Sequence, residues 1–168
     1  VELVALPNRE SRLRPFLRQA RSRYDFIFID TPPSLGLLAL NALVAADSVL
    51  IPMNCEYFAL EGLAELTATI ARVQAGLNPD LTLEGILLTM ADSRTRLGQG
   101  VAEEVRAHFA DKVYTTTIPR NIRLAEAPGH GVPAILYDVR STGAEAYLSL
   151  ARELLERHSP AAPPKPLL

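Results

Sequence analysis

Short runs of large apolar residues alternate along the chain with longer stretches in which apolar residues recur every three or four positions. The short runs predict strands over five segments, residues 2–6, 24–30, 47–52, 83–90 and 112–118. The helical spacing predicts helices over residues 11–23, 37–46, 59–77, 101–109 and 142–157. Because strands alternate with helices, and the strands are almost continuously apolar, we expect an α/β fold with a three-layer, doubly wound and mainly parallel sheet.

The loops that follow the predicted strands share one chemical character. In a parallel sheet such loops lie at the carboxyl edge, where open α/β sheets bind their ligands. Here they span residues 30–34, 52–58, 91–100 and 119–131. They gather acidic, amide, arginine and glycine residues, which is the composition expected of a phosphate and nucleotide site.

One of these loops begins at Asp30, which ends the apolar run Phe26–Ile29. Two prolines follow almost at once, and proline cannot continue a central strand. An acidic residue at the end of a buried strand is the Walker B arrangement, which holds the magnesium ion of a bound nucleoside triphosphate. The alternative for Asp30 is a solvated residue that only ends its strand.

Composition and charge limit the class of protein. The 168 residues are 48% hydrophobic and 21% charged, enough for one domain with a sizeable core. A net charge of −2 argues against a basic coat over the whole surface but permits a local basic patch. The arginine-rich stretch 9–23 is such a patch or, as we favour here, a solvated helix face.

The single cysteine, Cys55, cannot form an internal disulfide, which fits a reducing cytoplasm, and we expect it to be a small buried residue. The three histidines are scattered and show no spacing typical of a metal site. No apolar run approaches the length of a membrane span. The chain begins at Val1 directly in a predicted strand, so we expect preceding residues to be missing, and we place one domain at 1–158 before a disordered, Pro-rich tail at 159–168.

Four ordered blocks of the sequence resemble the ParA/Soj chromosome and plasmid partition ATPases, which belong to the deviant-Walker ParA/MinD class. The blocks are Tyr24–Leu35, then Asn41–Pro52 with Cys55–Gly62, then Gly85–Met90 with Asp92–Thr95, and Ile118–Pro128. The resemblance covers residues 1–157 and implies a fold of the P-loop NTPase type.

The sequence departs from this family at one motif. The family carries a Gly-rich Walker A loop with a signature lysine, and no Gly-x-x-x-x-Gly-Lys-Ser/Thr pattern occurs in this chain. The chain therefore resembles the C-terminal two-thirds of a ParA protein, with the first strand and helix of the sheet missing. Without the loop amides and lysine, we do not expect this chain to bind ATP by itself.

The resemblance implies roles for five residues. Asp30 would hold Mg²⁺, through water, next to ATP. Pro119 and Asn121 match the segment that borders the adenine. Arg94 and Arg123 are similar in position to arginines that bind DNA without reading its bases. No residue of this chain is assigned a catalytic role.

The function implied by the resemblance is ATP-dependent DNA segregation in the cytoplasm, in association with the nucleoid. ATP would close two copies into a homodimer that binds DNA non-specifically, and a ParB/Spo0J-type partner would stimulate hydrolysis. One alternative is a DNA-binding pseudo-subunit without ATP chemistry. Another is a MinD-like regulatory ATPase on membranes, which the Pro-rich end with its lone Lys165 disfavours.

Overall fold

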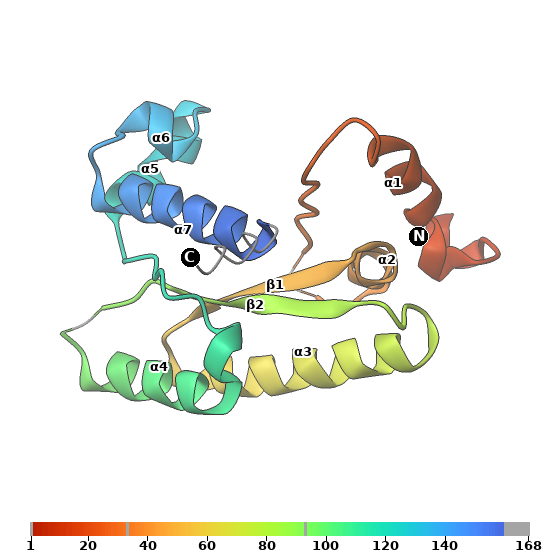
Figure 1. Ribbon diagram of the computed structural model, residues 1–168, viewed down its shortest axis with the longest axis horizontal. Helices are drawn as coiled ribbons and strands as arrows, with labels where there is room; N and C mark the ends of the chain where they lie inside the picture. The colour runs from red at the N-terminus through yellow and green to blue at the C-terminus, as the bar shows by residue number, and fades with distance from the viewer. Residues whose placement is uncertain (1, 33, 93, 160–168) are drawn as a thin grey trace, which may run out of the picture. The chain divides into compact units, whose positions relative to one another are not determined.

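The computed structural model describes residues 2–32, 34–92 and 94–159, and it divides the chain into two compact units. Unit 1 consists of Val1–Ile51 and Glu61–Gly85, and unit 2 of Pro52–Leu60 and Ile86–Leu168. The division runs through three elements, which are β1 (Ser48–Asn54), α3 (Tyr57–Gly76) and β2 (Thr82–Thr89) (Figure 1). The prediction of one domain over 1–158 is not tested by this division and stays a prediction, and the predicted tail lies outside the described residues beyond Ser159.

Unit 1 is built on the first halves of two parallel strands. Its other elements are η1 (Glu2–Ala5), η2 (Arg9–Ser11), α1 (Arg14–Ala20) and α2 (Leu37–Ala45). β1 and β2 pair with each other, and the amide of Thr82 donates a hydrogen bond to the carbonyl of Asp47 at 3.0 Å. Because this bond joins the starts of both strands, they run parallel, with α3 as the crossover. The α/β class with a parallel sheet is therefore confirmed.

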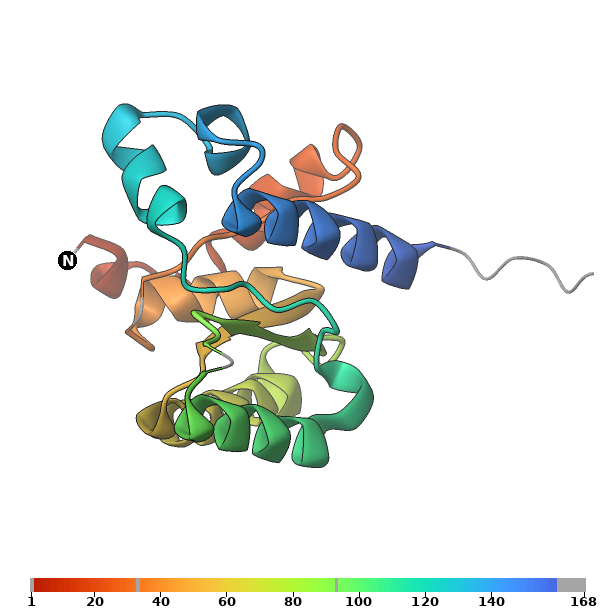
Figure 2. The ribbon, with the colours of Figure 1, turned by 90° about the vertical axis from the view of Figure 1, so that its left-hand side faces the viewer.

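The core of unit 1 lies where α2 and α3 cover opposite sides of the strands (Figures 1 and 2). Many of the apolar residues that recur at helical spacing in the sequence lie in this core. The buried side chains include Ala42, Val44, Ile51, Leu63, Ile70, Val73 and Leu81. The predicted helices 37–46 and 59–77 are confirmed, since α2 and α3 differ from them by at most two residues at each end.

A buried amide, Asn41 of α2, fixes the segment that leads into α1. Its Nδ2 donates to the carbonyls of Arg9, at 2.7 Å, and Leu37, at 2.9 Å, and its Oδ1 accepts from the amide of Leu13 at 3.2 Å. The side chain is almost completely buried, so these bonds replace water that the amide has lost.

A second buried amide, Asn78, fixes the other end of α2. It follows α3 and donates from Nδ2 to the carbonyls of Leu43, at 3.0 Å, and Ala46, at 2.8 Å. These carbonyls are at the C-terminus of α2, where no helical partner is left for them. Asn78 therefore closes α2 and ties it to the end of α3.

Unit 2 contains the remaining helices. They are α4 (Arg96–Phe109), η3 (Ala110–Lys112), α5 (Ile122–Glu126), η4 (Ala127–His130), α6 (Ala134–Tyr137) and α7 (Thr142–His158). The predicted helix 101–109 begins earlier, at Arg96, because the Thr95 side chain caps it by accepting from the amide of Gly98 at 3.3 Å. The predicted helix 142–157 is confirmed as α7.

Three predicted strands are wrong. Residues 2–6 form the 3₁₀ helix η1, and residues 24–30 lie outside any strand, with Phe26 and Ile27 each 39% exposed and Phe28 72% exposed. Both segments have the apolar pattern of a buried strand. The described part of the chain pairs neither of them with β1 or β2, and a strand needs such a neighbour.

The third wrong strand, 112–118, runs beside β2 but is interrupted. Parallel bridges join Ile86 with Val113 and Ala91 with Pro119. The amides of Tyr114 and Ile118 donate to the carbonyls of Ile86 and Leu88, each at 2.9 Å, so this segment advances four residues while β2 advances two. The residues between these two bonds leave the ladder, which explains why an apolar segment in contact with β2 is not a regular strand.

We expect Asn78→Ala to lower the free energy of unfolding by about 1–3 kcal/mol, because two carbonyls at the end of α2 lose their donor in a buried place. Urea titration followed by circular dichroism measures the change. Exposed Gln19 of α1 provides the control, and Gln19→Ala should stay within about 0.5 kcal/mol of the parent chain. Equal stability of Asn78→Ala and Gln19→Ala would contradict the role given to Asn78.

Candidate functional site

The segment that leads to the predicted adenine-bordering residues is held by α7. Oε1 and Oε2 of Glu153 accept from the amides of Thr115 and Thr116, each at 2.8 Å. Arg157 donates to the carbonyl of Val113 at 3.2 Å, and its guanidinium carbon lies 3.8 Å from the ring centre of the fully buried Tyr114. In a regular strand, the backbone groups of Val113, Thr115 and Thr116 would bind a neighbouring strand. Here they bind side chains of α7.

The charge of Glu153 is stabilised by the same contacts. Burial by itself raises the pKa of this carboxyl, but the hydrogen bonds from Thr116 and Thr115 and the nearby Arg157 outweigh it. The net effect is that the pKa of Glu153 lies below its ordinary value. Arg157 also donates to Glu153 Oε1 at 2.9 Å, so the two side chains form a pair on successive turns of α7.

Pro119 and Asn121, the two predicted adenine-bordering residues, lie together at the end of this segment and are half-buried. Asn121 caps α5, since its Oδ1 accepts from the amide of Arg123 at 2.9 Å. Its Nδ2 donates to Oγ1 of Thr142, the first residue of α7, at 2.8 Å. The side chain of Asn121 thus joins two helices. A nucleotide can bind this side chain only if one of these hydrogen bonds breaks, or if it contacts atoms of Asn121 that the bonds do not use.

Arg123, predicted to bind DNA, is surrounded by carboxylates. Its Nη1 lies 2.9 Å from Glu126 Oε2 and its Nε lies 3.5 Å from Asp138 Oδ2. The hydroxyl of Tyr137 donates to the same Glu126 oxygen at 3.2 Å. The hydrogen bond from Arg123 lowers the pKa of Glu126, and the carboxylate in turn raises the pKa of Arg123. Sequence reasoning gave Glu126 no role, and the structure shows it as the main partner of Arg123.

Arg94, the other predicted DNA-binding residue, forms a two-pronged pair with Asp92. Its Nε and Nη2 donate to the two carboxylate oxygens at 2.9 and 2.8 Å, and its backbone amide donates to Oδ1 at 3.0 Å. The hydrogen bond from Arg94 holds the pKa of Asp92 well below its usual range. The Arg94 side chain is nevertheless 86% exposed, so a phosphate can approach it from solvent.

Asp30, predicted to hold magnesium, is exposed and belongs to unit 1, whereas the other four predicted residues belong to unit 2. Among the described residues, no three Asp, Glu, His or Cys side chains are grouped so as to hold a metal ion. The sequence given contains no Gly-rich loop with a lysine, so its residues do not supply the amides and the lysine charge that hold a triphosphate.

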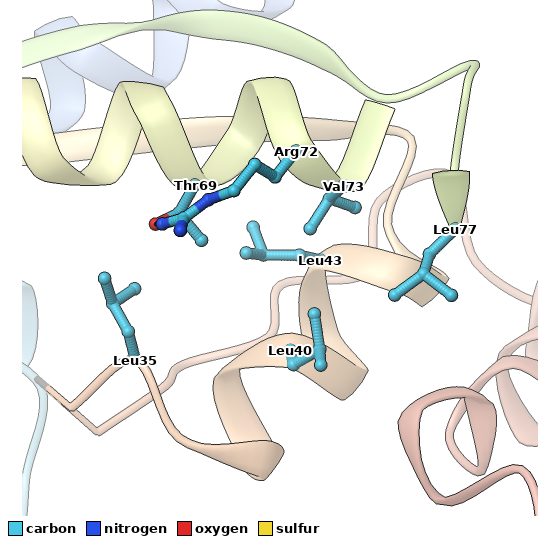
Figure 3. A pocket seen from close by; sticks show the side chains of 7 residues that line it. All are labelled: Leu35, Leu40, Leu43, Thr69, Arg72, Val73 and Leu77. Atoms are coloured by element: carbon cyan, nitrogen blue, oxygen red, sulfur yellow. The ribbon is translucent and has the colours of Figure 1, made fainter. Parts of the chain in front are cut away.

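A hollow of about 220 Å³ in unit 1 has a different character. It is lined by Leu35, Leu40, Leu43, Thr69, Arg72, Val73 and Leu77 (Figure 3). The one cation of this lining, Arg72, donates to Oγ1 of Thr69 at 2.9 Å. The lining is mainly apolar, so this hollow does not supply the backbone amides and lysine that a triphosphate requires.

Sequence reasoning missed the contacts of α7 with residues 113–116. The sequence did offer one signal, because Glu153 and Arg157 are four residues apart on a helix, a spacing at which ion pairs form. The bond from Thr115 to Glu153 could not be predicted, because the two residues are 38 positions apart in the sequence.

Comparison with known proteins places these residues in context. Residues 1–83 match the family model described as an AAA domain. The chain is 60% identical over 163 residues to the chromosome partitioning protein ParA of Myxococcus xanthus, covering 97% of this chain and 58% of that protein. It is 60% identical over 154 residues to the sporulation initiation inhibitor protein Soj of Bacillus subtilis, covering 92% of this chain and 61% of that protein. The chain thus spans about three-fifths of the length of these relatives.

Among solved structures, the chain is similar to cobyrinic acid a,c-diamide synthase of Mycobacterium smegmatis, in a crystal structure with a bound ATP analog and magnesium. The TM-score is 0.79 at 35% identity, covering 96% of this chain and 59% of that one. A plasmid partition protein of Borrelia burgdorferi gives a TM-score of 0.70 at 24% identity, covering 90% of this chain and 56% of that chain, which supports the fold alone.

We expect Glu153→Gln to lower the free energy of unfolding at pH 7 by about 1–2 kcal/mol, because the charged acceptor of two backbone amides is lost. Since the folded pKa of Glu153 is depressed, its contribution is complete above the unfolded pKa of about 4.3 and disappears as pH falls through the folded pKa. The stability gap between parent and variant should therefore be wide at pH 7 and close below pH 4.

Urea titrations at pH 7, 5, 4 and 3 measure this gap. Glu156→Gln provides the matched control, because it removes the same charge from an exposed position of α7. A gap that stays constant from pH 7 to pH 3 would show that the carboxylate charge of Glu153 is not what stabilises residues 113–116.

Proposed function

We propose that the chain belongs to the ParA/Soj family of partition ATPases and that it supplies the Walker B carboxylate, the adenine-bordering segment and a DNA-contacting surface of such an ATPase. The observation that carries this proposal is the 60% identity with ParA of Myxococcus xanthus and with Soj of Bacillus subtilis, in each case over more than nine-tenths of the chain. The assignment as an ATPase rests on the family, and the activity of the whole protein is part of the proposal.

The proposed nucleotide contacts are Asp30 toward Mg²⁺, through water, and Pro119 with Asn121 beside the adenine. When bound with its magnesium ion, ATP supplies a γ-phosphate whose presence or loss can order or release segments of a protein. The support for this ligand is at family level, since a structural neighbour was crystallised with an ATP analog and magnesium. The phosphate-binding amides and lysine are not among the residues of this chain, so we assign no chemical step to it.

The proposed DNA contacts are Arg94 and Arg123. Both are on exposed segments of unit 2, and guanidinium groups bind phosphate oxygens without reading base sequence. Each already has a carboxylate partner, Asp92 and Glu126 respectively. DNA phosphates would have to share or displace these acids, which keeps the affinity moderate and sensitive to salt.

The proposed cycle is that of a switch. ATP brings two copies together, the dimer binds DNA on the nucleoid, and a ParB/Spo0J-type partner stimulates hydrolysis and release. No helix within the described ranges is both long and apolar enough to cross a membrane.

Nucleotide and DNA titrations of the same purified chain test the two sets of proposed contacts separately.

In the first titration, a fluorescent ATP analogue with Mg²⁺ is added to the purified chain while circular dichroism confirms that the chain is folded. We expect no saturation below about 100 μM, because most of the phosphate-binding charge is missing. Asp30→Asn should give the same flat titration. Saturable, Mg²⁺-dependent binding that Asp30→Asn abolishes would show that this chain binds the nucleotide unaided and would contradict the expectation.

In the second titration, fluorescence anisotropy follows binding of a labelled duplex at 50, 100 and 200 mM salt. We expect Arg94→Gln/Arg123→Gln to reduce the slope of log K against log salt by about 1.8, since each lost phosphate contact removes about 0.9. Arg106→Gln/Arg152→Gln is the matched control, because it removes two exposed arginines from α4 and α7. Equal slopes for the two double variants would remove Arg94 and Arg123 from the proposed surface.

A further inference from the structure

The positive charge of the chain is concentrated in one segment of unit 1. Residues 9–23, here called the basic segment, hold six of the 17 basic residues and one of the 19 acidic residues. The segment therefore has a net charge of +5, while the remaining residues together have −7. A local charge of this size attracts polyanions even though the whole chain is acidic.

Most arginines of the basic segment are not neutralised by the protein. Arg9 pairs with Glu10, and Arg21 pairs with Asp47. The other four form no ion pair with any residue that the structure describes; they are Arg12, Arg14, Arg18 and Arg23. This distinguishes them from Arg94 and Arg123, whose guanidinium groups are already bound to carboxylates.

Two of these arginines are aligned by α1. Arg14 and Arg18 are four residues apart and lie on the same side of the helix, about 6 Å apart along its axis. One strand of duplex DNA carries a phosphate about every 3.4 Å along the duplex axis. Two long arginine side chains with this spacing reach phosphates of one strand without any change in α1.

The basic segment is also fixed in place. The buried amide of Asn41 binds the carbonyl of Arg9 and the amide of Leu13, on either side of the turn that begins the segment. On α1 itself, Leu17 and Ala20 are half-buried. The segment therefore does not have to be ordered by its ligand, which lowers the entropic cost of binding.

We propose that Arg12, Arg14, Arg18 and Arg23 form a second DNA-contacting surface, which binds the phosphate backbone of duplex DNA without reading its sequence. The choice of ligand rests on the proposed function, whereas the surface itself is separate from Arg94 and Arg123. A protein with two such surfaces contacts more phosphates than one, so its affinity and its salt dependence both rise.

Duplex DNA fits this surface better than an anionic membrane does. A helix that lies on a membrane needs a broad apolar face to insert below the headgroups. α1 has seven residues, and among its large apolar side chains only Phe16 is exposed, at 69%. Leu17 and Ala20 are half-buried within unit 1, so phosphate charge is the main attraction that remains.

The test compares three double variants of the full chain in the anisotropy titration with a labelled duplex. They are Arg14→Gln/Arg18→Gln, Arg94→Gln/Arg123→Gln and the control Arg106→Gln/Arg152→Gln. We expect Arg14→Gln/Arg18→Gln to lower the salt slope by about 1.8, so that its affinity deficit relative to the parent is about 12-fold larger at 50 mM than at 200 mM salt. The control should keep the parent slope.

The outcomes separate this inference from the proposed function. A loss in Arg14→Gln/Arg18→Gln with none in Arg94→Gln/Arg123→Gln supports the second surface and contradicts the first. The reverse pattern overturns the second surface and leaves the proposed function intact. The second surface is also overturned if the parent chain does not bind the duplex at 50 mM salt. Binding of the basic segment to phosphatidylserine vesicles instead of the duplex overturns it as well. Circular dichroism of each variant shows whether a loss reflects unfolding.

Discussion

A strand exists only while another strand satisfies its backbone amides and carbonyls, and this requirement organises the whole chain. In the described residues, β1 and β2 satisfy it for each other through the crossover helix α3. Residues 113–116 meet it in another way, by binding the carboxylate of Glu153 and the guanidinium of Arg157 on α7. Residues 26–29 have the same apolar character and form no strand. Whether an apolar segment of this chain forms a strand thus depends mainly on whether another segment binds its backbone groups, and less on the strand propensity of its residues.

The arginines fall into two electrostatic groups with different consequences. Arg94 and Arg123 are held by acids in unit 2, so their geometry is fixed and their charge is partly compensated. The arginines of the basic segment have uncompensated charge on a helix that Asn41 anchors. The first group favours defined geometry, and the second favours long-range attraction. Long-range attraction speeds the encounter with an anionic partner, and fixed contacts slow its release.

The sequence predicted the elements whose apolar pattern coincides with a packing or pairing partner in the described residues. Helices such as α2, α3 and α7 follow from apolar spacing, and β1 and β2 follow from apolar runs on either side of α3. The Asp92–Arg94 and Arg123–Glu126 pairs were within reach as well, because they join neighbours in sequence. The contacts from Glu153 to Thr115 and from Asn121 to Thr142 were not, since they depend on how distant segments pack. The residues proposed for the site could be named from the sequence, whereas the partners that position them could not.

The stretch Phe26–Ile29 has a further consequence outside folding and ligand binding. Its aromatic residues are exposed, and Phe26 and Phe28 stack with their ring centres 6.5 Å apart. Four consecutive β-prone apolar residues without charge or proline match the composition of segments that pair between molecules in fibrils. Exposed apolar residues of this kind favour association between copies of the purified chain at high concentration, independently of its folding free energy.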